Sequence, residues 1–97
     1  MQGGGTVARM VGTRMSYWLA QACRLVREDA KLSQTRVAGE VGVRETSVYR
    51  FEIGSSWPRD PERYVNAYAK LAGLEDPRTV WMRALELWGQ HGENPFL

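Results

Sequence analysis

The strongest constraint on the fold lies in residues 42–54, a segment that begins and ends with glycine. Between the two glycines the apolar side chains fall on one seam of a short helix over about residues 45–53. A second short helix is expected just upstream, over about residues 34–41, with Ser33 as its N-cap. The sequence therefore predicts two short helices joined by a tight turn at Gly42.

Two short helices joined by a glycine-containing turn form a helix-turn-helix, whose second helix can lie in the major groove of DNA. The charge distribution agrees with such a partner. Residues 1–54 carry eight basic and five acidic residues, a net charge of +3, whereas residues 55–97 carry five and six, a net charge of −1. That excess alone lies within the ordinary scatter of globular chains. Together with the motif, it predicts double-stranded DNA as the partner.

Three further helices complete an all-α, five-helix prediction with no strand. The first is expected from Ser16 to about residue 30, and the fourth and fifth open with the Asp-Pro pairs at 60–61 and 76–77. Apolar residues recur along the first helix at the spacing of a single buried stripe. The members of this stripe are Leu19, Ala22, Cys23, Val26 and Ala30.

The ends of the chain are expected to lie outside this domain, which should span residues 15–91. Residues 1–14 contain three consecutive glycines and show no apolar periodicity, so they predict a flexible arm. Arg9 and Arg14 make the arm basic. It either follows the DNA backbone or is an idle terminus. Residues 92–97 are expected to form a tail without regular structure.

The motif residues resemble the lambda-repressor/Cro-like (XRE-type) helix-turn-helix family of bacterial and phage DNA-binding regulators. The resemblance covers about residues 19–74 and depends on the whole set at fixed spacing, because each element alone is weak. Its elements are Arg27, Leu32-Ser33-Gln34, Val37-Ala38, Gly42-Val43, Ser47-Val48, Phe51-Glu52, Gly54, Pro58 and Leu74. The resemblance implies that Arg27 and Glu52 form a partly buried ion pair between the first helix and the end of the third.

The outward positions of the third helix are, by the same resemblance, the ones that contact base edges. They are Glu45, Thr46, Tyr49 and Arg50, whose spacing puts them on one side of the helix. Arg50 suits a bidentate contact to guanine, Thr46 a thymine methyl or a hydrogen bond, and Glu45 the cytosine amino group. Tyr49 suits a sugar or a methyl group. The alternative is an ordinary solvated polar face.

Contacts to the DNA backbone are expected from Gln34, at the start of the second helix, and from Arg36 and Arg44 beside it. Arg44 departs from the family, which usually places a serine or threonine cap there. Residues 55–57 also depart, because family members often carry basic residues at this point and this chain has Ser-Ser-Trp.

The fifth helix carries a wide apolar band. Trp81, Leu85 and Trp88 form a stripe that needs a cover, and aromatic anchors of this kind are typical of interface centres. The cover is either a ridge of the same chain, formed by Trp18 and Leu25, or the same helix of a second subunit. The sequence favours a homodimer, whose two recognition helices would lie about 34 Å apart on a near-palindromic site.

The leading function predicted is sequence-specific DNA binding by a transcriptional regulator, most simply a repressor. The alternative is an antitoxin that neutralises a partner protein through its C-terminal helix and regulates itself by binding DNA. An enzyme is not expected, because the one histidine, His91, has no partners for a catalytic or metal site. No cofactor, metal or membrane partner is predicted, and the lone Cys23 indicates a reducing, cytoplasmic location. The family resemblance implies association with the nucleoid of a bacterial cell.

Overall fold

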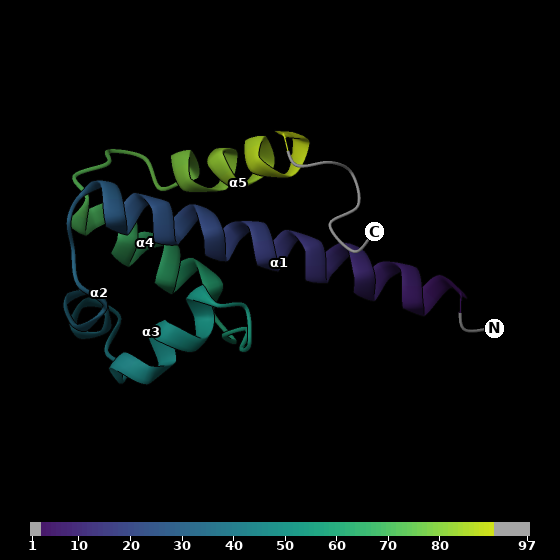
Figure 1. The fold of residues 1–97 in the computed structure, drawn as a ribbon, viewed down its shortest axis with the longest axis horizontal. Coiled ribbons are helices and arrows are strands. Elements are labelled where there is room, and N and C mark those ends of the chain that lie inside the picture. The colour runs from purple at the N-terminus through teal and green to yellow at the C-terminus, as the bar shows by residue number, and fades with distance from the viewer. Residues whose placement is uncertain (1–2, 91–97) are drawn as a thin grey trace.

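The structure, a computed structural model, describes the backbone of residues 3–90 and the side chains of residues 15–90. That part of the chain contains helices and no strand, so the all-α prediction is confirmed. Figure 1 shows one long helix with the shorter ones gathered along its C-terminal half. The helices are α1 (Gly3–Asp29), α2 (Gln34–Val41), α3 (Glu45–Glu52), α4 (Pro61–Leu71) and α5 (Arg78–Gln90).

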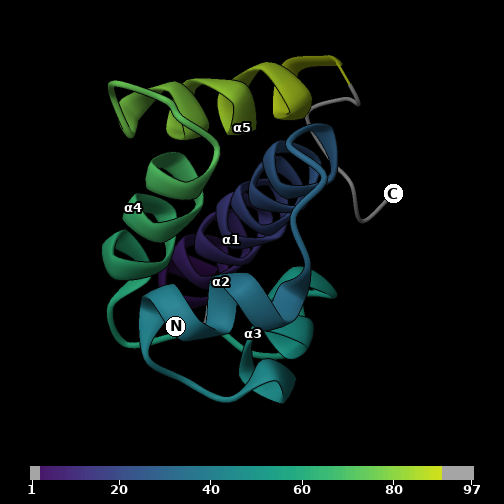
Figure 2. The same cartoon turned by 90° about the vertical axis from the view of Figure 1, so that its left-hand side faces the viewer.

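The long helix α1 is the element around which the others are arranged. It packs against α3, α4 and α5, while α2 packs against α3 and α4. Figures 1 and 2 both show α5 on one side of α1 and the pair α2 and α3 on the other. Leu19, Ala22 and Cys23 are fully buried, so this part of the predicted stripe faces the core. The core therefore encloses one face of α1 and holds the short helices against it.

The starts of the short helices follow from their capping residues. Ser33 accepts a hydrogen bond from the main-chain N–H of Arg36 at 3.0 Å, and Asp60 accepts one from Arg63 at 3.2 Å. Asp76 accepts one from the first residue of α5 at 2.9 Å. Each cap satisfies a donor that has no partner within its own helix. The three helix starts therefore lie where the sequence predicts them.

The predicted start of the first helix is wrong. We expected a helix from Ser16 with a flexible arm over residues 1–14, whereas α1 already begins at Gly3. Figure 1 shows that this N-terminal part of α1 projects beyond the other helices. Glycine is unfavourable within a helix, but extending a helix that is already held in place adds one hydrogen bond per residue, and residues 3–14 contain no proline.

The turn between α2 and α3 depends on Gly42. Its φ of 87° lies in the left-handed region, which side chains with a Cβ rarely adopt. A Cβ at this position would also lie only 3.1 Å from Nη2 of Arg63 on α4. The backbone angle therefore requires glycine at the turn, and a Cβ would in addition need the exposed Arg63 side chain to shift.

Gly39, within α2, has a different environment. The residue is exposed, and a Cβ built on it would meet no atom within 4 Å. Packing does not require a glycine here. The residue therefore imposes the usual cost of glycine in a helix without a compensating contact.

Replacing Gly39 with alanine should stabilise the protein by about 1 kcal/mol, because alanine restricts the unfolded chain and favours the helix. Urea unfolding followed by circular dichroism measures the change. Gly42→Ala is the matched control, and it should destabilise the protein because of the positive φ. A loss of stability in Gly39→Ala would mean that this glycine has a structural role.

Candidate nucleic-acid interface

Helix α3 is attached to α1 by an ion pair at its last residue. Nε of Arg27 lies 2.7 Å from Oε2 of Glu52, and Nη2 of Arg27 lies 2.9 Å from Oε1. The third guanidinium nitrogen, Nη1, donates to the main-chain oxygen of Leu32 at 2.9 Å. The structure therefore brings together the two residues that the family resemblance paired. The planar guanidinium matches both carboxylate oxygens and also holds the chain that leads into α2.

Two further side chains complete the surroundings of this carboxylate. The hydroxyl of Tyr68 donates to Oε2 of Glu52 at 2.6 Å, and Nε2 of Gln34 donates to Oε1 at 3.1 Å. Glu52 itself is only 1% exposed. We call Arg27, Gln34, Glu52 and Tyr68 the Glu52 network. Because it joins α1, α2, α3 and α4 at one buried carboxylate, it fixes the position of α3 relative to the rest of the fold.

The electrostatics of the Glu52 network keep the carboxylate ionised. Burial raises the pKa of Glu52, but the hydrogen bonds from Arg27, Tyr68 and Gln34 outweigh burial and hold the pKa below its usual value. The hydrogen bond to Glu52 raises the pKa of Arg27. Burial and the bond to this carboxylate raise the pKa of Tyr68, which therefore remains a donor. Burial, assisted by the nearby negative charge, also raises the pKa of the Cys23 thiol, which stays protonated.

The apolar seam of α3 faces the core. Val48 and Phe51 are fully buried, as the sequence predicts. The ring of Phe51 lies 4.9 Å from that of Tyr64 and 6.1 Å from that of Tyr68, both on α4. Its centroid is also 6.2 Å from that of Trp57, in the loop after α3. Aromatic contacts of this kind hold the helix in one rotational setting.

The opposite face of α3 is open to solvent. The side chains expected to contact bases are all exposed, and Tyr49, the largest of them, is 51% exposed. No other described part of the chain covers this face. Figures 1 and 2 show α3 at the edge of the molecule on the side of α1 away from α5. The exposed residues are Glu45, Thr46, Tyr49 and Arg50.

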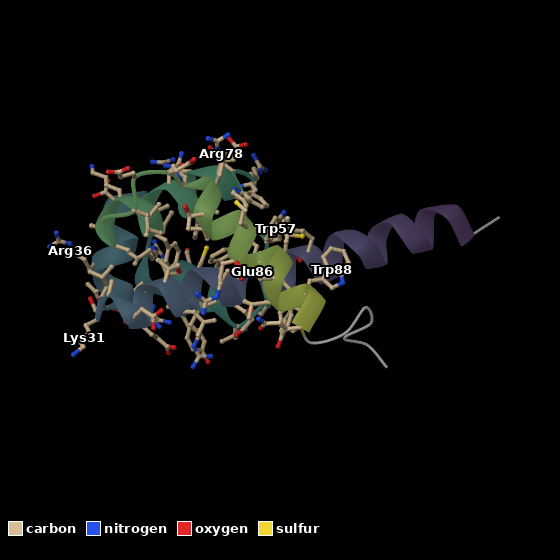
Figure 3. All side chains as sticks on the ribbon, turned by 90° about the horizontal axis from the view of Figure 1, so that it is seen from above. Lys31, Arg36, Trp57, Arg78, Glu86 and Trp88 are labelled. Atoms are coloured by element: carbon tan, nitrogen blue, oxygen red, sulfur yellow. The ribbon has the colours of Figure 1, made fainter. Side chains whose placement is uncertain are left out.

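The residues expected to contact the DNA backbone divide into two kinds. Arg36 and Arg44 are exposed, and Figure 3 shows Arg36 projecting from the end of the molecule opposite the N-terminal part of α1. Arg44 precedes α3 in an extended conformation and makes no side-chain cap, yet α3 still begins at Glu45. The side chain of Gln34 instead donates to Glu52. Of the two donors of Gln34, the main-chain N–H is therefore the one available for a phosphate contact.

Sequence reasoning missed two residues of this region. Tyr68 is not among the site residues expected from the sequence, although a buried tyrosine hydroxyl requires a hydrogen-bond partner, and that requirement could have predicted a polar contact such as the one with Glu52. Thr35 was not singled out at all. Its hydroxyl donates to the carboxylate of Glu45 at 2.5 Å, from the first turn of α2 to the first residue of α3. No sequence pattern indicated that pair.

The arrangement is thus an exposed polar helix face, held rigidly from behind and flanked by arginines. A helix of this kind can enter the major groove, while the flanking cations lie near phosphates. Among the described residues, no helix has both the length and the apolar character required to cross a membrane.

Comparison with known protein families identifies the class of this domain. The family described as a helix-turn-helix domain matches residues 18–81, which is more than half of the chain. The chain therefore belongs to the helix-turn-helix domain family, and its DNA-binding domain is of the XRE/Cro-like type. Comparisons with curated proteins and with solved structures gave no match.

Removing the buried carboxylate should destabilise the fold strongly. Glu52→Gln should lower the free energy of unfolding at pH 7 by about 3–5 kcal/mol, because it leaves the Arg27 charge poorly compensated. The pKa of Glu52 is lowered in the folded state, so its contribution is present above the ordinary value of 4.5 and is lost as pH falls through the folded value. The difference between the two proteins in urea unfolding should therefore shrink below about pH 4.5.

The exposed pair between Arg24 and Glu28 provides a matched control. Glu28→Gln removes the same charge from an i, i+4 surface pair and should cost less than about 0.5 kcal/mol. Equal costs for the two substitutions would show that the Glu52 network does not anchor α3.

Proposed function

We propose that this chain is a sequence-specific double-stranded DNA-binding protein that regulates transcription, acting as a repressor on the nucleoid of a bacterial cell. The observation that carries the proposal is the division of α3 into two faces. Val48, Phe51 and Glu52 are buried against the other helices, while the opposite face is exposed and polar. A rigid helix with one free polar face has the geometry of a major-groove element. Occupying a promoter in this way blocks access of polymerase, which is why repression is the proposed sense of regulation.

The proposed base contacts follow from the chemistry of the exposed side chains. Arg50 donates two hydrogen bonds to the O6 and N7 acceptors of a guanine, and Glu45 accepts from the amino group of a cytosine. Thr46 contacts a thymine methyl or donates a hydrogen bond, and Tyr49 packs on a sugar or methyl group. Each contact to a base edge distinguishes one base pair, so the set defines a short preferred sequence.

The proposed backbone contacts provide affinity without sequence preference. Arg36 and Arg44 are exposed on either side of the turn region, where a helix in the groove would bring them close to phosphates. The loop after α3 lacks basic residues over Ser55-Ser56-Trp57. These two arginines therefore carry a larger part of the phosphate attraction than the loop does.

The proposed contact of Arg50 is tested by Arg50→Ala after selection of a preferred site from random duplexes. The variant should bind that site about 1–3 kcal/mol more weakly and lose its preference at one base pair, because a bidentate contact is removed. Affinities measured on the selected site and on unrelated duplex separate the two effects.

Arg36→Ala is the control for the loss of a positive charge. It should weaken binding to all duplexes alike and reduce the slope of log K against log salt by about one unit. If Arg50→Ala behaves in the same way, Arg50 contacts the backbone and the proposed base contact is wrong.

The proposal includes a homodimer formed through α5. Leu85 and Met82 are 56% and 62% exposed, although both are apolar. Trp81 and Trp88 are partly buried against the core of their own chain and border these two residues on α5. We call these four residues the α5 stripe. A second copy of the same helix would cover the exposed part of the stripe.

The position of α5 sets a condition on this dimer. α5 and α3 lie on opposite sides of α1 (Figure 1). The two copies of α3 can reach successive turns of the major groove on one face of DNA only if both point to the same side of the dimer. The twofold axis must then pass beside α5, on the side of α5 that is nearer to α3. An axis through the surface most distant from α3 would direct the two helices away from each other and remove the preference for a palindrome.

Leu85→Glu should dissociate the dimer, since it places a charge in the proposed contact. Sedimentation equilibrium should show self-association weakened by at least about tenfold, with unchanged affinity for a single half-site. Thr79→Glu, an exposed substitution earlier in α5, is the control and should leave self-association unchanged.

A wild-type protein that is monomeric at all concentrations would refute the dimer. The α5 stripe would then be the surface for a partner protein, as in the antitoxin alternative.

A further inference from the structure

The contact between Thr35 and Glu45 joins the two helices of the motif at the surface proposed to face DNA. The hydroxyl of Thr35 lies 2.5 Å from Oε2 of Glu45, and both residues are exposed. Thr35 stands in the first turn of α2, and Glu45 is the first residue of α3. A surface contact of this kind is not needed to hold the helices, because the Glu52 network and the apolar seam already do so. Its effect is on the Glu45 carboxylate itself.

A glutamate side chain is otherwise poorly suited to specific contact. It has several rotatable bonds, and ordering it on binding costs rotamer freedom. An exposed carboxylate near DNA is also repelled by phosphates, which favours conformers that turn away from the groove. Thr35 opposes both effects. Its β-branched side chain has few rotamers, and a hydroxyl that donates to a carboxylate forms a charge-assisted hydrogen bond.

We propose that Thr35 is a positioning residue that holds Glu45 in the conformer that accepts a hydrogen bond from a base, and so sets the sequence preference at that base pair. This inference depends on the proposed function, because it concerns a base contact. With Oε2 occupied by the Thr35 hydroxyl, Oε1 remains free to accept from the amino group of a cytosine. At the corresponding place in the major groove, guanine and thymine present hydrogen-bond acceptors, which a fixed carboxylate repels.

Gln34, the neighbouring residue on α2, does not share this role. Its side-chain amide donates to Oε1 of Glu52 and is directed toward the Glu52 network. Among the described side chains, Thr35 is the hydrogen-bond partner of Glu45, and replacing Thr35 leaves the buried network intact. Because Thr35 lies outside the Glu52 network, the preference for a base pair can be changed by substituting Thr35 without changing the fold.

The experiment compares the wild type with Thr35→Val, Thr35→Ser and Glu45→Ala by binding-site selection from random duplexes. The base pair whose preference is lost in Glu45→Ala defines the position that Glu45 contacts. At that position Thr35→Val, which keeps the shape but removes the donor, should reduce the preference about fivefold. Thr35→Ser keeps the hydroxyl and should retain the preference. In the Glu45→Ala background, Thr35→Val should change the preference no further.

A second measurement needs no DNA. NMR scalar couplings of the Glu45 side chain in the free protein should report one dominant rotamer in the wild type and in Thr35→Ser. In Thr35→Val they should take values averaged over several rotamers. An unchanged base preference in Thr35→Val, or averaged couplings in the wild type, would overturn the inference while leaving sequence-specific binding intact.

A wild type that enriches no sequence would instead overturn the proposed function, and the inference with it. A further change from Thr35→Val in the Glu45→Ala background would show that Thr35 contacts DNA directly, which also overturns it.

Discussion

The structure depends on one buried carboxylate. Glu52, the last residue of α3, accepts hydrogen bonds from Arg27 on α1, Gln34 on α2 and Tyr68 on α4. A buried charge is costly unless it is fully paired, and here every helix that borders α3 contributes a donor. Together with the rings packed around Phe51, this arrangement holds α3 in one position and one rotation. The inner face of α3 therefore carries the contacts that hold the helix in place.

That attachment separates the part of α3 that packs in the fold from the part that we propose contacts DNA. The inner residues are buried against the other helices, whereas the outward residues are exposed to solvent. One scaffold can therefore carry different outward side chains and recognise different sites. The Thr35–Glu45 hydrogen bond extends this division to the surface, because one outward residue holds another without involving the core.

The parts of the fold that the sequence predicts are those governed by local chemistry. The caps at Ser33 and Asp60, the turn at Gly42 and the buried seam each depend on one residue type at one spacing. The start of α1 was mispredicted because glycines lower helix propensity, while propagation from a packed helix compensates for them. The contacts of Gln34 and Thr35 could not be predicted, because each depends on which of several acceptors a polar side chain meets after folding. The exposed face of α3 lies where its spacing indicates, although spacing alone does not identify what it binds.

The central claim is that the exposed face of α3 lies in the major groove of a specific DNA site. Dimethyl sulfate footprinting tests this directly on a duplex selected by the wild-type protein, since the reagent methylates guanine N7 in the major groove and adenine N3 in the minor groove. The account predicts protection of guanine N7 within the selected sequence, and loss of that protection at one guanine in Arg50→Ala. Protection confined to adenine N3, or uniform along random duplex, would contradict it.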